Sequence, residues 1–137
     1  MSGERLAAAA EGLIGTPFRL HGRDPATGLD CIGVLARSLH SIGMPARLPD
    51  AYSLRAQEVR GLEIVAEASG FAPAHGASVP GDVLFARIGP VQFHLLIAAR
   101  DSRFVHAHAG LRRVVIGKLG EGWSIVGHWR LDPDFQG

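Results

Sequence analysis

Residues 91–108 are VQFHLLIAARDSRFVHAH, and this stretch predicts a β-hairpin. Two apolar or alternating runs, Val91–Ala98 and Arg103–His108, flank a short polar stretch, which is typical of strands joined by a turn. Similar runs, separated by Gly, Pro or Asp, lie on both sides of the hairpin: Val83–Arg87, Arg113–Leu119 and Trp123–Leu131. The second half of the chain is therefore expected to form an antiparallel meander.

The first part of the chain predicts helices. Apolar residues recur at helical spacing near the N-terminus, at Leu6, Ala10, Leu13 and Ile14, before the breaker at 15–17. The same spacing recurs further on, at Ile32, Leu35, Leu39 and Ile42. Asp30 is the expected N-cap of this second helix and Gly43 its terminator. A loop over 22–28, an extended crossing over 44–52 and a weaker helix over about 54–68 complete the prediction.

Helices first and a meander after them indicate an α+β fold, with N-terminal helices packed on a small, curled antiparallel sheet. The length of 137 residues fits one domain, 1–137. With 47% apolar and 20% charged residues, the chain is unlike disordered proteins. A net charge of +1 argues against nucleic-acid or anionic-membrane partners, and a single cysteine excludes an internal disulfide.

Targeting signals are not expected either. The apolar run 6–10 is shorter than a signal-peptide core and is bounded by Glu4 and Glu11. The most apolar window, 83–99, contains Arg87 and Pro90 and is too polar to span a bilayer. We therefore expect synthesis and folding in the cytoplasm, so that an extracellular role would need a carrier.

The only cysteine, Cys31, lies in the first turn of the predicted second helix. Unpaired backbone N–H groups and the positive end of the helix dipole favour a thiolate there, which predicts a pKa below the ordinary value of about 8.5. Asp30 opposes this shift by like-charge repulsion, and the same N–H groups could bind an oxyanion. The alternative is a buried structural cysteine, the commonest state of a lone intracellular thiol.

His94 and His106 lie on the two strands of the predicted hairpin. A turn centred on Arg100 would place them directly opposite each other, with Cβ atoms about 4.5–5.5 Å apart on one face. A turn centred on Asp101 would place His94 opposite His108 instead, and an even-length turn would separate His94 and His106 onto opposite faces. We expect the first arrangement, against the alternative of two half-buried histidines bonded only to backbone.

Five segments together resemble the ordered motifs of NlpC/P60 cysteine peptidases. They are Thr16-Pro17-Phe18-Arg19, Gly28-Leu29-Asp30-Cys31-Ile32-Gly33, Pro80-Gly81-Asp82-Val83-Leu84-Phe85, His94, and Phe104-Val105-His106-Ala107. The resemblance runs from about Leu6 to Leu131, and the order of the motifs and the interval between the two histidines make it fairly specific. It implies a papain-like α+β fold and a thiol protease that cleaves peptidoglycan stem peptides, typically after γ-D-glutamyl residues, without a cofactor.

The resemblance also implies roles for individual residues. Carried over position by position, Cys31 is the nucleophile, His94 the general base and acid, and His106 the residue that orients His94. Asp30 matches a family position that helps to bind the polar end of the substrate. Phe18 and His21 are further candidates for the substrate cleft.

Four residues depart from the family pattern. Phe18 stands where a tyrosine is usual, Ile32 replaces a serine, and Leu96 replaces a glycine. His21 occupies a position that is often glycine, with one extra residue before Cys31. These changes leave the Cys–His–His set intact and concern the specificity for the substrate.

Other functions are compatible with the same residues. One is a catalytically silent binding or assembly module of a phage-like tail, whose particle would also carry a wall peptidase to its target. Another is a papain-like amidase or acyltransferase acting on a related amide outside the wall. The histidines, with His108 added, could bind zinc together with Cys31. No Cys-x-x-Cys or His-Glu-x-x-His motif accompanies them, so we expect no metal.

Overall fold

The computed structural model describes residues 2–44, 66–90 and 93–132. The helices within these ranges are α1 (Ser2–Glu11) and α2 (Cys31–Ser41). The strands are β1 (Arg23–Asp24), β2 (Gly28–Leu29), β3 (Phe71–Pro73), β4 (Val83–Arg87), β5 (Phe93–Ala98), β6 (Phe104–His108), β7 (Arg113–Gly117) and β8 (Ser124–Leu131). None of the helices in these ranges is long and apolar enough to cross a membrane.

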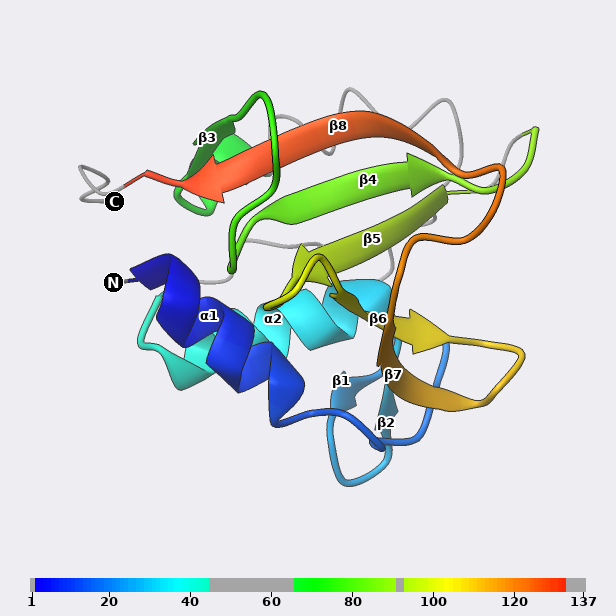
Figure 1. The fold of residues 1–137 in the computed structure, drawn as a ribbon. Helices are drawn as coiled ribbons and strands as arrows, with labels where there is room; N and C mark the ends of the chain where they lie inside the picture. The colour runs from blue at the N-terminus through cyan, green and yellow to red at the C-terminus, as the bar shows by residue number, and fades with distance from the viewer. Residues whose placement is uncertain (1, 45–65, 91–92, 133–137) are drawn as a thin grey trace.

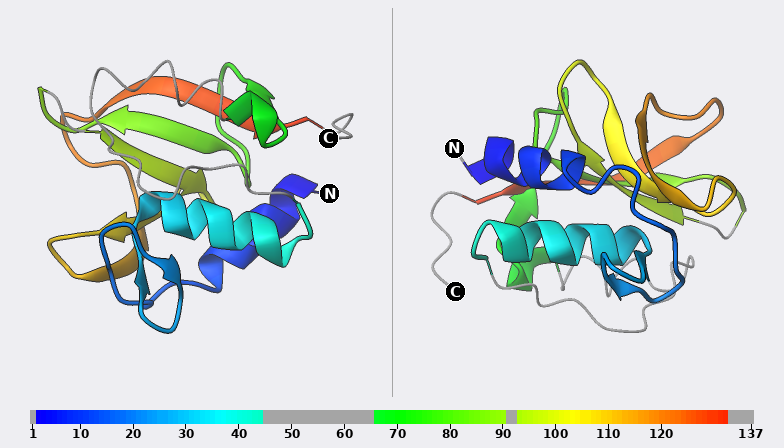
Figure 2. Two further views of the ribbon diagram at one scale, coloured as in Figure 1. Left: turned by 180° about the vertical axis from the view of Figure 1, so that it is seen from behind. Right: turned by 90° about the horizontal axis from the view of Figure 1, so that it is seen from below.

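Six strands form one antiparallel sheet in the order β3-β8-β4-β5-β6-β7 (Figure 1). Both helices lie on one face of this sheet, next to each other (Figure 2). The strands β1 and β2 form a separate two-stranded ribbon immediately before α2. The α+β architecture predicted from the sequence, with N-terminal helices on an antiparallel sheet, is confirmed.

The main core fills the space between the helices and the sheet. The predicted apolar stripe of α2 points into it, since Ile32, Leu35 and Leu39 are all buried. The alternation of side chains along a strand supplies the other wall, for example Phe93, Leu95 and Ile97 of β5. Apolar burial of this kind is the main favourable contribution to folding.

A second, smaller cluster lies on the opposite face of the sheet. Its buried members are Leu84, Ala86, Leu96, Ala98 and Phe104, and Trp123 packs against it. Since alternate residues of a strand share a face, His94 of β5 and both His106 and His108 of β6 project on this side. The sheet therefore separates an apolar helix-side core from a face that carries the histidines.

A buried carboxylate connects the start of β4 to β8. Asp82 has no exposed surface, and it accepts hydrogen bonds from Arg130 (2.8 and 2.9 Å) and from the backbone N–H of Val79 (3.1 Å). His128 contacts the same carboxylate at 2.6 Å. Burial alone would raise the pKa of Asp82, but these partners lower it overall, so the group is an anion held by a cation.

Some predicted elements differ from those observed. The loop predicted over 22–28 contains the β1–β2 ribbon, and β3 was not predicted at all. These strands have two or three residues, too few to show a periodic pattern. Strand β7 ends at Gly117, two residues earlier than predicted. Apart from Met44, the crossing over 44–52 lies outside the described residues, as does most of the helix over 54–68, of which Ala66–Ala68 is helical.

Candidate active site

Cys31 is the first residue of α2, as predicted. The preceding residue, Asp30, is the N-cap, with extended backbone angles (φ −96°, ψ −172°) and a side chain that accepts a hydrogen bond from the N–H of Gly33 at 2.8 Å. This bond satisfies one of the N–H groups that a helix start leaves without a partner. The local sequence therefore places the thiol beside the N–H groups of the first helical turn.

The Asp30 carboxylate is engaged by the protein on both oxygens. Besides Gly33, Oδ1 accepts a hydrogen bond from Arg23 (2.8 Å), and Oδ2 accepts one from the backbone N–H of His21 (2.8 Å). Asp30 is only 6% exposed. These bonds attach the loop before β1 to the start of α2, while the contact with substrate expected for Asp30 stays a prediction.

The surroundings of the Cys31 thiol favour its protonated form. Burial raises the pKa of Cys31 to about 12, and the charge of Asp30 adds to the rise. Hydrogen bonding from the backbone N–H groups of Leu95, Ile32 and Cys31 itself acts in the opposite direction with less effect. The lowered pKa predicted from the helix start is therefore wrong, because loss of solvation outweighs the helix dipole here.

Cys31 lies beside the residue that follows His94 in β5. The pairing of β5 with β6 covers only Ile97 and Ala98, opposite Val105 and Phe104. Nearer the start of β5, the backbone N–H of Leu95 lies close enough to the thiol of Cys31 in α2 to lower its pKa. The nucleophile predicted from the sequence and the predicted base thus belong to adjoining parts of the structure.

The two histidines predicted to act together are neighbours. The ring centroids of His94 and His106 lie 5.4 Å apart, with an angle of 58° between the ring planes. The ring of His108 lies 5.9 Å from that of His106. His106 therefore occupies the middle of a row of three imidazoles, and it is His106 that packs on His94.

The register that brings them together differs from the one predicted. Ile97 opposes Val105, which centres the hairpin on Asp101 and, continued along the strands, sets His94 opposite His108. The Arg100-centred turn is therefore wrong, and His94 and His106 meet as a diagonal pair. The turn between the strands contains two left-handed residues, Asp101 and Ser102 (φ 60° and 56°).

The imidazoles of His94 and His106 are neutral at neutral pH. Burial lowers the pKa of His94, and a charge on His108 would lower it further. Burial also lowers the pKa of His106 to about 4, with repulsion from His94 and His108 added. His108 is held differently, since its Nδ1 accepts a hydrogen bond from the N–H of Leu111 at 3.0 Å.

The chemistry available is that of a protonated thiol near the backbone of Leu95 and a neutral imidazole on His94, the preceding residue. No hydrogen bond joins Cys31 to His94 among the described residues, so the pair is not a preformed thiolate–imidazolium. Catalytic hydrogen bonds are often long before substrate binds, and such a pair can still transfer a proton during attack. Within the described ranges, no group of three His, Cys, Asp or Glu side chains is arranged to hold a metal ion.

The remaining candidates lie around the helix start. Phe18 is partly buried, packs against the main core and forms a bridge with Leu29. The side chain of His21 is exposed, and its backbone adopts a left-handed φ of 60° while bonding Asp30. The structure places both within a few residues of Cys31, and their contact with substrate stays a prediction.

Two residues at the site were not predicted. Arg23 forms an ion pair with Asp30. The feature of the sequence that could have indicated this pair is the presence of opposite charges on the two sides of the turn at 24–27. The indole of Trp123 packs against both His94 and His106. The feature of the sequence that could have indicated this packing is the Gly-rich turn at 120–122, directly before Trp123.

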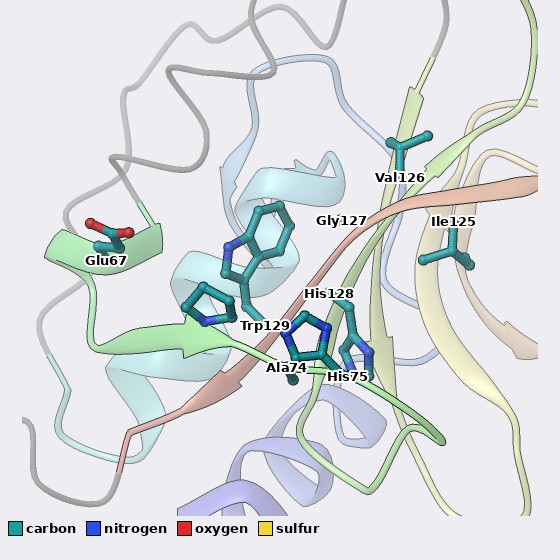
Figure 3. Close-up of a pocket in the computed structure, with 9 residues that line it drawn as sticks. Glu67, Ala74, His75, Ile125, Val126, Gly127, His128 and Trp129 are labelled. Carbon is teal, nitrogen blue, oxygen red and sulfur yellow. The ribbon is translucent and has the colours of Figure 1, made fainter.

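An open cavity of about 400 Å³ lies elsewhere, along β8 and β3 (Figure 3). The described residues that line it are Glu67, Pro73, Ala74, His75, Ile125, Val126, Gly127, His128 and Trp129. None of the predicted site residues is among them. The cavity is therefore separate from the Cys31–His94 site.

Comparison with known proteins identifies the fold. No family model matches the sequence, and no curated protein matches it. The structure is similar to NlpC1 from Trichomonas vaginalis, with a TM-score of 0.70 and 18% identity over 94% of this chain and 44% of that one. It is also similar to the NlpC/p60 domain of the peptidoglycan hydrolase SagA, with a TM-score of 0.63 and 23% identity over 92% and 96%.

A third similar structure is the peptidoglycan hydrolase RipB from Mycobacterium tuberculosis, with a TM-score of 0.57 and 17% identity over 94% and 63%. The chain spans less than half the length of the two Trichomonas vaginalis structures that it matches. At these identities the likeness concerns the fold. It is the fold expected from the motifs.

Proposed function

We propose that this chain, which has the NlpC/P60 fold, is a cysteine peptidase that hydrolyses amide bonds in the stem peptides of bacterial cell walls. The observation that carries the proposal is the placement of Cys31, at a helix start and against the N–H of Leu95, directly after His94. The similarity to the peptidoglycan hydrolases SagA and RipB supports the choice of substrate class.

The proposed reaction has two stages, the acylation of Cys31 and the hydrolysis of the resulting thioester. The sulfur of Cys31 attacks the amide carbonyl carbon while its proton passes to His94, and the N–H groups at the start of α2 stabilise the oxyanion. His94 then gives this proton to the leaving amine, and a thioester with Cys31 remains. A water molecule, deprotonated by His94, hydrolyses the thioester to the carboxylic acid and restores the thiol.

His106 has the orienting role in this proposal. Its ring packs on that of His94, and a neutral imidazole can hold a neighbouring ring in one tautomer without adding a charge. Because both Cys31 and His94 are neutral before substrate binds, the proton is transferred together with the attack rather than beforehand.

The scissile bond proposed is the one after a γ-D-glutamyl residue, by resemblance to the NlpC/P60 motifs. Phe18 lies next to Leu29, two residues from Cys31, and offers an aromatic surface without a hydroxyl. Asp30 is bonded to Arg23 and His21. We therefore expect the substrate side of the site to recognise shape and backbone groups more than a free amine.

The experiment is to incubate the purified protein with synthetic stem peptides of defined sequence and to identify the fragments by mass spectrometry. Cleavage on the carboxyl side of γ-D-glutamate, absent in Cys31→Ala and His94→Ala, is the expected result. His40→Ala, at an exposed position of α2, is the matched control and should retain activity. Cleavage that persists in Cys31→Ala would exclude the proposed nucleophile.

The raised pKa of Cys31 favours a second candidate, a binding module that does not cleave. Calorimetry with the same peptides separates the two. A silent module would bind the peptide, leave it intact, and bind it equally well in the Cys31→Ala variant.

A further inference from the structure

One side chain from outside the sheet touches both histidines of the proposed active site. The indole of Trp123 lies 5.6 Å from the ring of His94, at an angle of 53°, and 5.8 Å from that of His106, edge-on at 80°. These separations are typical of favourable aromatic pairs. Trp123 directly precedes β8, whereas the histidines belong to β5 and β6, so the contact joins three parts of the chain.

The turn before β8 determines where this indole lies. The N–H of Trp123 donates a hydrogen bond to the carbonyl of Gly120 at 3.2 Å, which closes the turn. A Cβ atom at Gly120 would lie 2.4 Å from Cε2 of Trp123 and 2.6 Å from its Nε1. Only glycine leaves room for the ring at this position, because both distances are far below van der Waals contact.

The indole also covers the two imidazole rings. His106 is only 5% exposed, and its Nδ1 is buried and makes no hydrogen bond to the described residues. Trp123 packs against the small cluster that includes Leu96 and Phe104, so its ring continues the apolar surface over the histidines. An apolar cover of this kind disfavours the charged form of an imidazole.

The other groups around the two rings are few. Ala86 of β4 opposes His94, and Val115 of β7 opposes His106. Within the described ranges, the titratable group near both rings is His108, one pleat further along β6, whose charge lowers the pKa of each. Among the described residues, Trp123 is therefore the side chain that packs on both proposed catalytic imidazoles at once.

We propose that Trp123 is a positioning residue, which holds the rings of His94 and His106 in their mutual orientation and excludes water from them. Gly120 is part of the same device, because it provides the space for the indole. The inference rests on the proposed function for its effect on turnover. The effect on the imidazoles themselves does not depend on that function.

The direct test is an NMR titration of the histidine rings in the wild type, Trp123→Leu and Trp123→Phe. In Trp123→Leu the pKa of His106 should rise from its low value by about one unit, toward that of an exposed histidine, because water reaches the ring. Trp123→Phe, which keeps an aromatic ring, should retain most of the wild-type behaviour. Circular dichroism and thermal unfolding would verify that each variant is folded.

Gly120→Ala extends the test without altering the aromatic residue. The added methyl group should displace the indole and reproduce the rise seen in Trp123→Leu. Leu119→Ala, an exposed position in the same turn region, is the matched control and should leave the histidine pKa values unchanged.

Peptide cleavage provides the second measurement. Trp123→Leu should lower kcat about 10- to 100-fold with little change in KM, since a misplaced catalytic group costs rates of this order. The acidic limb of the pH profile should move to higher pH. Unchanged histidine pKa values in folded Trp123→Leu would overturn the proposal. Shifted values in a protein that cleaves no stem peptide would support the positioning role and contradict the proposed peptidase.

Discussion

His94 and His106 lie 5.4 Å apart, although the register of their strands sets His94 opposite His108. A hairpin centred on Arg100 and one centred on Asp101 differ in register, but both leave His94, His106 and His108 on the same face of the sheet. Their rings are large enough to bridge the diagonal of the ladder. The contact between the two rings therefore requires a turn with an odd number of residues, but it can form whichever of the two residues is at the centre.

Because His106 packs on His94 and His108 does not, the two histidines of β6 should differ in function. His106→Ala is expected to lower kcat roughly 10- to 1000-fold, the range for a residue that orients a catalytic base. His108→Ala should stay close to wild type, with a small rise in the pKa of His94 from the lost repulsion. Steady-state kinetics on a stem peptide would measure the difference between the two variants. Impaired activity in His108→Ala alone would contradict the orienting role of His106.

The thiol should react slowly in the absence of substrate. With a pKa of about 12, Cys31 is almost entirely protonated at pH 7, so iodoacetamide should alkylate it more slowly than free cysteine. The rate should rise about tenfold per pH unit up to pH 11, in step with the thiolate fraction. Alkylation at pH 6 that is faster than for free cysteine would contradict this state of the thiol.

Asp30→Asn tests one cause of that raised pKa. The amide keeps a cap oxygen for Gly33 and removes the charge beside Cys31, so alkylation at a given pH should become faster. The matched control is Asp24→Asn, an exposed aspartate whose side chain bonds Ala26 in the same loop. An equal increase in both variants would mean that the charge of Asp30 has no specific effect on the thiol.

Acid should destabilise the protein through His106. Its pKa is about 4 in the folded state against 6.5 in the unfolded state, so the unfolded chain binds a proton first as the pH falls. Stability is therefore unaffected above pH 6.5 and is lost between 6.5 and 4, by about 3 kcal/mol at most. Urea denaturation at pH 7 and pH 4.5 should show a smaller difference in His106→Gln than in the wild type, with exposed His40→Gln as control.

Asp82 should matter for folding and not for the chemistry. Asp82→Asn removes the buried charge that binds the partly exposed Arg130 and contacts His128, and loss of these charge-assisted hydrogen bonds should cost about 1–3 kcal/mol. Since the folded-state pKa of Asp82 is lowered, its contribution is present above pH 3.8 and is lost as the pH falls below that value. Thermal unfolding would measure the loss, while activity per folded molecule should stay unchanged.

The strong local signals in the sequence predicted their elements well. Strand β4 has the predicted bounds, because glycine and proline punctuate the chain on both sides of it. The start of α2 at Cys31 follows from the capping side chain of Asp30, which acts within three residues. The shared face of His94 and His106 was also predicted, because it follows from strand alternation together with a turn of odd length.

Other features depend on information that is not local. The hairpin register goes with a turn that has left-handed angles at Asp101 and Ser102, and neither residue requires them. The pKa of Cys31 is raised mainly by burial in the folded chain, whereas the sequence shows only the helix dipole. The packing of Trp123 on the histidines likewise requires the return of β8 beside β4, far from the hairpin in the sequence.

The two faces of the sheet differ in how freely their residues can be exchanged over evolutionary time. Substitutions among the large residues of the helix-side core, such as Leu39 or Ile97, carry the full energetic cost of a cavity in the main core. The histidine face buries a much smaller cluster around Leu96 and Phe104, so a change there alters the electrostatic environment of the imidazoles at a lower cost to the fold. A lineage of such chains could diverge in pH range and substrate preference through one face while inheriting its architecture unchanged through the other.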